Sequence, residues 1–108
     1  MRILFDQATP VPIRPYLIGH IVRTAFQQGW DRLENGDLLN AAKQAGFDLL
    51  LTTDKNMRYQ QNLEGRKIAL LVLGQQQWAL LRPQVQLVVD AVNVAKPGSY
   101  TEVDIPVE

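Results

Sequence analysis

The sequence contains no cysteine, and this absence excludes several kinds of site. Without thiols the chain has no disulfide framework, no thiolate zinc site and no thiol nucleophile. Its single histidine, His20, cannot form the multi-histidine cage of a catalytic zinc ion. An apolar run of about 18 residues is also missing, so we expect no membrane span. The apolar stretch before Asp6 is too short for a secretory signal, and we expect a cytoplasmic location.

An excess of positive charge is missing as well. The 11 basic and 11 acidic residues cancel, so the chain lacks the basic surface that tight, salt-dependent binding of duplex nucleic acid requires. Any contact with nucleic acid is therefore expected to be local or transient. The chain length fits one domain, residues 1–108, and the hydrophobic fraction of 46% suits a globular core.

What the sequence does contain is a regular alternation of apolar runs and helical patterns. Short, largely apolar runs predict strands at 2–5, 20–26, 47–52, 67–74 and 99–105. The last of these alternates between apolar and polar residues, which is typical of an edge strand. The other runs are too uniformly apolar for a sheet that faces water, so we expect a sheet covered on both faces.

Helices are predicted in the connections between these strands. The clearest one begins at Asp37 and stops at Gly46, because positions 38, 41, 42 and 45 are apolar and share one helix face. Prolines at 10, 12 and 15 limit the first connection to a loop and a short, irregular helix that ends near Gly19. Two further helices are predicted, a short one within 55–65 and a longer one at 83–96.

Strands that alternate with helices indicate βα units and a mainly parallel sheet. We therefore expect an α/β fold, a three-layer α/β/α sandwich with the sheet in the centre. In open parallel sheets, ligands bind beyond the carboxyl ends of the strands, where the strand order reverses. Side chains that directly follow the strands are consequently the first candidates for a functional site.

Three aspartates occupy such positions. Asp6 ends the first strand, Asp54 follows the strand at 47–52, and Asp37 begins the helix that leads to that strand. If all three lie at the carboxyl edge of the sheet, their charges repel unless a cation is bound. Mg²⁺ or Mn²⁺ would remove that repulsion, because hard cations bind carboxylate oxygens. Such a centre can activate a water for attack on a phosphodiester.

These residues also have structural interpretations, because an aspartate that follows a strand often belongs to a turn or caps a helix. Asp54 is well placed to cap the following helix, and Asp37 suits a first helical turn because of the helix dipole. Thr52 and Thr53 either cap that helix or hold the Asp54 carboxylate through their hydroxyl groups. The residues alone leave these alternatives open.

Two basic residues flank the same aspartate in the chain. Lys55 and Arg58 either contact a phosphate of the substrate or form a solvated helix face. Their positions close to Asp54 make them, with Thr53, the candidates for substrate binding.

The block LLTTDKNMRYQQNL (50–63), a first strand that ends in Asp6 and an acid at the start of the mid-chain helix together resemble the PIN-like fold. In particular, they resemble short, single-domain PIN-like proteins with a first-strand Asp and a T-x-D-K motif, over roughly residues 1–74. The resemblance implies that Asp6, Asp37 and Asp54 bind a divalent metal for ribonuclease action. It also implies single-stranded RNA as substrate and an antitoxin-type protein as partner, and a homodimer is compatible with it.

Two positions depart from the pattern of these proteins. Gln7 stands where related short proteins often carry a second acid, and Asn56 stands where the position two after Asp54 is often acidic. Fewer carboxylates should weaken metal binding, although Glu34 lies three residues before Asp37 and offers a replacement.

Two alternatives to a ribonuclease stay open. The loss of acids favours a catalytically inactive binding module of the same fold. A phospho-receiver-like signalling domain is the other alternative, because an Asp follows the first strand and another follows the third, and Lys96 precedes a proline. Gln7 and Gly74 count against it, since receivers carry a second acid and a strand-ending Ser or Thr at these places.

Overall fold

Five parallel strands form one sheet in the computed structural model, which describes residues 1–60 and 67–106, without the side chains of residues 58–60. The strands are β1 (Arg2–Phe5), β2 (Ile21–Thr24), β3 (Leu49–Thr52), β4 (Ala69–Leu73) and β5 (Tyr100–Val103). They lie in the order β2-β1-β3-β4-β5, and every neighbouring pair is parallel. The predicted parallel sheet is therefore confirmed.

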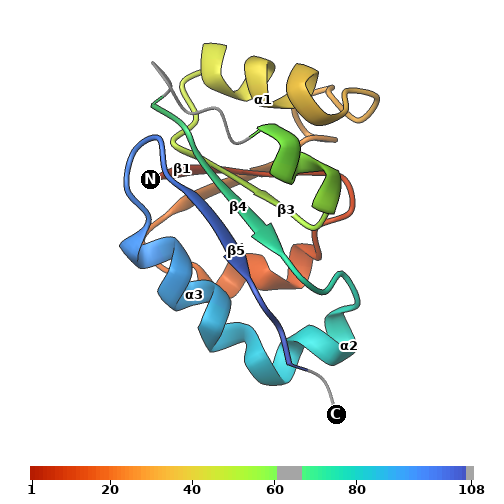
Figure 1. The fold of residues 1–108 in the computed structure, drawn as a ribbon, viewed down its shortest axis with the longest axis vertical. Helices are drawn as coiled ribbons and strands as arrows, with labels where there is room; N and C mark the ends of the chain where they lie inside the picture. The colour runs from red at the N-terminus through yellow and green to blue at the C-terminus, as the bar shows by residue number, and fades with distance from the viewer. Residues whose placement is uncertain (61–66, 107–108) are drawn as a thin grey trace.

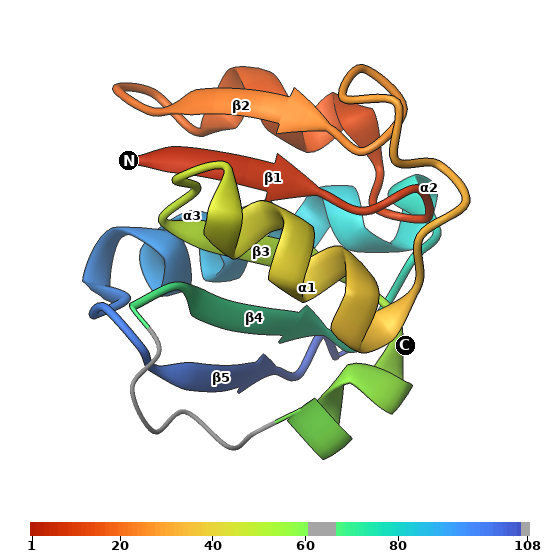
Figure 2. The ribbon, with the colours of Figure 1, turned by 90° about the horizontal axis from the view of Figure 1, so that it is seen from above.

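Helical segments cover both faces of this sheet. The α-helices are α1 (Asn35–Gln44), α2 (Trp78–Leu81) and α3 (Val85–Val94), and the 3-10 helices are η1 (Val11–Tyr16), η2 (Lys55–Gln60) and η3 (Arg82–Gln84). Figures 1 and 2 show α1 on one face of the sheet and α3 on the other. The predicted three-layer α/β/α arrangement is confirmed.

The alternation of side chains along the central strands divides the core into two halves. On β1 and β3, Ile3, Phe5, Leu49 and Leu51 pack with Val88 and Val92 of α3. The residues between them on these strands point to the opposite face, where they pack with Leu38, Leu39 and Ala42 of α1. Successive side chains of a strand point to opposite faces, so strands buried on both sides must be apolar at every position.

The bounds of helix α1 lie close to those predicted from the sequence. It starts two residues before the predicted Asp37 and ends at Gln44, and Gly46 follows with a φ of +83°. This left-handed conformation is the one that glycine adopts readily after a helix. The predicted apolar face is rotated slightly, because Leu39 is buried whereas Ala45 is exposed.

Other boundaries differ from the predicted ones. The strand predicted at 20–26 is shorter, because the chain turns after Thr24, where Gln28 N–H bonds to Thr24 C=O. The short helix predicted within 55–65 is the 3-10 helix η2, and Gly65 lies outside the described residues. Helix α2 was not predicted, because four residues are too few to show a helical period.

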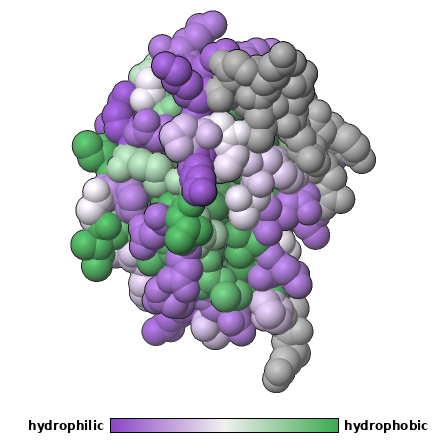
Figure 3. Space-filling model, turned by 60° about the vertical axis from the view of Figure 1, so that its left-hand side comes forward, coloured by the Kyte–Doolittle hydropathy of each residue, from purple (hydrophilic) through white to green (hydrophobic). Residues whose placement is uncertain are grey.

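The surface carries apolar as well as polar side chains. Ile18, Phe26 and Val94 are the most exposed of the large apolar residues that the structure describes. Figure 3 shows apolar side chains interspersed with polar ones on one face of the molecule. Of the helices in the described ranges, none has the length and apolar character needed to cross a membrane.

Candidate functional site

A hollow opens at the carboxyl ends of β1 and β3. The chain runs from β1 to β2 on one side of the sheet and then crosses to β3 on the other side of β1, so the strand order reverses here. Open parallel sheets bind their ligands at such a point. The hollow has a volume of about 500 Å³.

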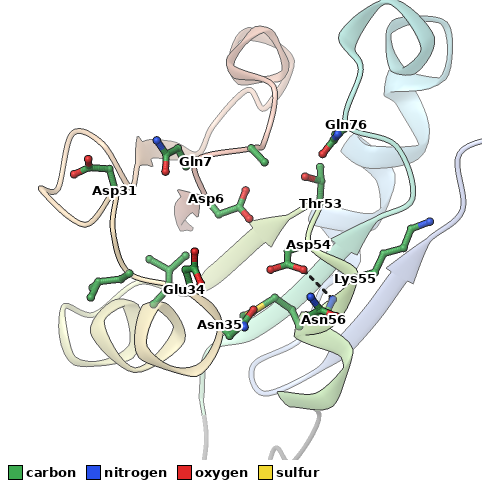
Figure 4. A pocket seen from close by; sticks show the side chains of 14 residues that line it. Asp6, Gln7, Asp31, Glu34, Asn35, Thr53, Asp54, Lys55, Asn56 and Gln76 are labelled. Atoms are coloured by element: carbon green, nitrogen blue, oxygen red, sulfur yellow. Dashed lines mark hydrogen bonds between the residues drawn. The ribbon is translucent and has the colours of Figure 1, made fainter.

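Four segments that lie far apart in the sequence contribute its lining (Figure 4). They are the residues after β1, the loop before α1 with the first turn of that helix, the residues after β3 and Gln76. The polar lining residues are Asp6, Gln7, Asp31, Glu34, Asn35, Thr53, Asp54, Lys55, Asn56 and Gln76. Four of these carry a carboxylate and one, Lys55, carries a positive charge, so the hollow is acidic.

The carboxylate of Asp6 is held by two threonine hydroxyls. Thr9 donates to Oδ1, and Thr52 donates to Oδ2. Both threonines are buried, at 3% and 0% exposure, so little water competes for these hydrogen bonds. The backbone N–H of Asp6 donates to Leu51 C=O at 3.2 Å, which continues the pairing of β1 with β3.

The surroundings of Asp6 shift the pKa of its carboxyl group in opposite directions. Burial raises the pKa of Asp6 above its ordinary value of 3.8, because the charged form loses hydration. The hydroxyls of Thr52 and Thr9 lower the pKa in part, because they donate to the carboxylate. The negative charge of Asp54 makes the smallest of these contributions, and it also raises the pKa of Asp6.

Asp54 performs the structural role that the sequence suggested and still faces the hollow. Its Oδ1 accepts the backbone N–H of Asn56 at 2.9 Å, and its C=O accepts the N–H of Met57 at 3.0 Å. Asp54 therefore starts η2 as a cap does. In Figure 4 its carboxylate and that of Asp6 point into the same hollow. Capping and ligand binding are thus compatible at this residue.

The structure does not bring Asp37 to the other two aspartates. Asp37 is exposed in the first turn of α1 and, among the described residues, is not one that lines the hollow. The other two carboxylates that line the hollow, Asp31 and Glu34, belong to the loop before this helix, which starts at Asn35. Glu34 was foreseen as a replacement acid, whereas Asp31 was not.

The predicted acidic residues therefore come together only in part. Within residues 1–60 and 67–106, no three histidine, aspartate or glutamate side chains are grouped closely enough to hold a metal ion. The expected trio of Asp6, Asp37 and Asp54 does not form one group, and the structure leaves the pair Asp6 and Asp54.

The candidates for substrate binding lie at different places. Thr53 lines the hollow, is 9% exposed, and its Oγ1 has no hydrogen-bond partner among the described residues. Lys55 is exposed, and Figure 4 shows its side chain directed away from Asp6. Arg58 belongs to η2, but its side chain lies outside the described residues.

Thr52 and Thr9 have roles that the sequence did not reveal. Thr52 does not hold the Asp54 carboxylate; its Oγ1 accepts the backbone N–H of Asp54 at 3.0 Å while donating to Asp6. The sequence does not single out Thr9, because a position three residues after a strand-ending Asp is a weak signal by itself. A turn in which Thr9 N–H donates to Asp6 C=O brings its hydroxyl back to the carboxylate.

Asn35 is a further lining residue that the sequence did not indicate. Its φ of +48° lies in the left-handed region, which asparagine tolerates better than most residues. Its buried Oδ1 has no hydrogen-bond partner within the described part of the chain. Asn35 and the amides of Gln7 and Asn56 give the hollow neutral oxygen atoms beside its carboxylates.

Lys96, the lysine expected of a phospho-receiver-like domain, does not lie at the edge of the sheet that carries the hollow. Lys96 lies in the turn that precedes β5. In this turn, Gly98 N–H donates to the C=O of Lys67, which lies just before β4. Lys96 is therefore at the amino edge of the sheet, opposite Asp6 and Asp54.

No family model, curated protein or solved structure matches this chain.

Proposed function

We propose that the protein is a divalent-metal-dependent endoribonuclease in which Asp6 and Asp54 hold the metal. The observation that carries this proposal is that the two carboxylates face one hollow from the ends of adjacent strands. Two partly buried carboxylates that repel each other are stabilised by a shared cation.

The residues present fit Mg²⁺ or Mn²⁺ better than a metal that needs a closed protein cage. Mg²⁺ keeps several waters and is commonly bound by one or two carboxylates together with substrate phosphates. Each oxygen of Asp6 accepts one hydroxyl and retains a lone pair, and Oδ1 of Asp54 accepts one N–H. When bound, such an ion polarises a phosphoryl oxygen and lowers the pKa of a coordinated water.

The other lining residues have supporting roles. Asp31 and Glu34, rather than Asp37, are the further carboxylates of the hollow that are available to accept a proton from water or to orient it. Thr53, whose hydroxyl has no partner among the described residues, can bond to the substrate, and Lys55 can contact a phosphate at the rim of the hollow. Arg58 remains a candidate for a second phosphate contact.

Charge supports single-stranded RNA as substrate. The net charge is zero, and the lining of the hollow contains one basic residue, Lys55, among those described. Duplex DNA carries a dense phosphate charge whose binding depends on many basic contacts. A short single-stranded segment needs fewer of them.

The proposal is tested by incubating a mixed single-stranded RNA pool with Mn²⁺ and the purified protein. We expect cleavage by the wild type and loss of cleavage in Asp6→Asn and Asp54→Asn. Asp37→Asn, which removes one carboxylate outside the hollow, is the matched control and should retain activity. Cleavage that persists in the Asp6 and Asp54 variants would point to a contaminant and contradict the proposal.

A catalytically inactive binding module is the second candidate. It is favoured by one observation, namely that within the described residues the acids do not form a group of three. If the wild type binds Mn²⁺ but leaves RNA intact, this candidate replaces the ribonuclease.

The resemblance to PIN-like proteins also implies a role in the cell. A toxin in the cytoplasm, neutralised by an antitoxin-type protein, is the corresponding role, and a homodimer is the corresponding assembly. Light scattering after size exclusion, alone and with candidate partners, measures the assembly.

A further inference from the structure

We propose that Thr9 is a positioning residue that fixes the orientation of the Asp6 carboxylate for cation binding. This inference rests on the proposed function, because it concerns a group that acts through Asp6. Thr9 itself lies outside the lining of the hollow, among the described residues, and is not expected to touch the cation or the substrate.

The evidence begins with the contacts of the Thr9 hydroxyl. It lies at hydrogen-bond distance from Oδ1 of Asp6 and 2.9 Å from Leu51 C=O. A hydroxyl carries one proton, and an ionised carboxylate is a stronger acceptor than a peptide carbonyl. Leu51 C=O also accepts the N–H of Asp6, so it keeps a partner when Thr9 donates to the carboxylate.

Thr9 is itself held in place. It is 3% exposed, and its backbone N–H donates to Asp6 C=O at 3.2 Å. Burial and this turn hold Thr9 beside Asp6, so its hydroxyl favours the carboxylate orientation in which Oδ1 faces it.

Thr52 completes the support on the other side of the carboxylate. Its Oγ1 donates to Oδ2 of Asp6 and accepts the N–H of Asp54. A chain of hydrogen bonds thus runs from Thr9 through Asp6 and Thr52 to the backbone of Asp54. The two buried hydroxyls therefore connect the Asp6 carboxylate to the backbone of Asp54, in the way that residues hydrogen-bonded to metal ligands orient those ligands elsewhere.

The decisive experiment measures Mn²⁺ affinity by electron paramagnetic resonance and isothermal titration calorimetry. Thr9→Val keeps the shape of the side chain and removes the hydroxyl, and it should weaken Mn²⁺ binding by roughly 10- to 100-fold. Thr9→Ser restores the hydroxyl and should return affinity to about the wild-type level. Circular dichroism and thermal melting confirm that each variant is folded.

Thr24→Val is the matched control. Thr24 ends β2 at the same edge of the sheet, and its hydroxyl accepts the N–H of Gln27 instead of contacting Asp6. Its Mn²⁺ affinity should equal that of the wild type. Should Thr9→Val fail to fold, Thr9→Ala provides the same comparison with a smaller side chain.

Each outcome has a defined meaning. Weak binding in Thr9→Val with recovery in Thr9→Ser supports the positioning role, because a merely structural loss would not be repaired by returning the hydroxyl alone. Unchanged affinity in a folded Thr9→Val or Thr9→Ala protein would overturn the inference while leaving the proposed metal site intact. A wild type that binds no Mn²⁺ would remove the proposed function and this inference together.

Discussion

Replacement of Asp54 by asparagine separates the two roles of this residue. Asparagine is about as good a cap as aspartate, so the bond from Asn56 N–H to the side-chain oxygen should survive. The substitution removes the negative charge that raises the pKa of Asp6. We therefore expect a folded variant that is at least as stable as the wild type without metal, but that no longer responds to Mn²⁺.

The size of the lost response follows from linkage. A cation that binds the folded state alone stabilises it by about 2.7 kcal/mol when its concentration is 100 times its dissociation constant. For a chain of about this length, that free energy raises the melting temperature by roughly 10 °C. Differential scanning calorimetry with and without Mn²⁺ measures the shift in the wild type, in Asp54→Asn and in Asp37→Asn.

The wild type and Asp37→Asn should show the same Mn²⁺-dependent rise in melting temperature, because Asp37 lies outside the hollow. An equal rise in Asp54→Asn would refute the reasoning, since it would show that the ion binds elsewhere. A rise that is lost in Asp37→Asn would instead restore Asp37 to the site.

Two further predictions concern the protein without metal. The folded state binds the proton of Asp6 more tightly than the unfolded state, so wild-type stability should fall as the pH rises from 3.8 through the raised pKa of Asp6. Asp6→Asn should lack this fall, and urea unfolding between pH 3 and 8 measures the difference; parallel pH profiles would contradict it. Gly46→Ala should lose about 1–2 kcal/mol in the same assay, because its φ is +83° and a Cβ would lie 3.3 Å from Arg2 Nη1. Unchanged stability would show that the backbone relaxes there at little cost.

The sequence predicted the fold well because the signals for it are local. Leu49, Leu50 and Leu51 are all buried, and a run without polar positions is sufficient to indicate a strand covered on both faces. Gly46 marked the end of α1 because few other residues adopt its conformation readily. Signals of this kind need only a few neighbouring residues.

The candidate site was predicted in part, and the difference has a physical cause. Asp6 and Asp54 follow adjacent parallel strands, so topology alone places them at one edge. The acids Asp31 and Glu34 reach the hollow through a loop whose path is set by tertiary contacts. Thr9 depends on a turn that folds back onto Asp6, and neither its residue type nor its spacing announces such a contact.

The pairing of β1 with β3 also determines when the site can form during folding. Leu4 pairs with Leu50, and the hydrogen bond between Asp6 and Thr52 joins residues that are 46 positions apart. Helix α1 can form from nearby residues, whereas this central pair requires the closure of a long loop, which slows folding. The hollow consequently appears only when the sheet itself is assembled. A cation that binds there would stabilise the native state and no earlier intermediate, so it should slow unfolding and leave the rate of refolding unchanged.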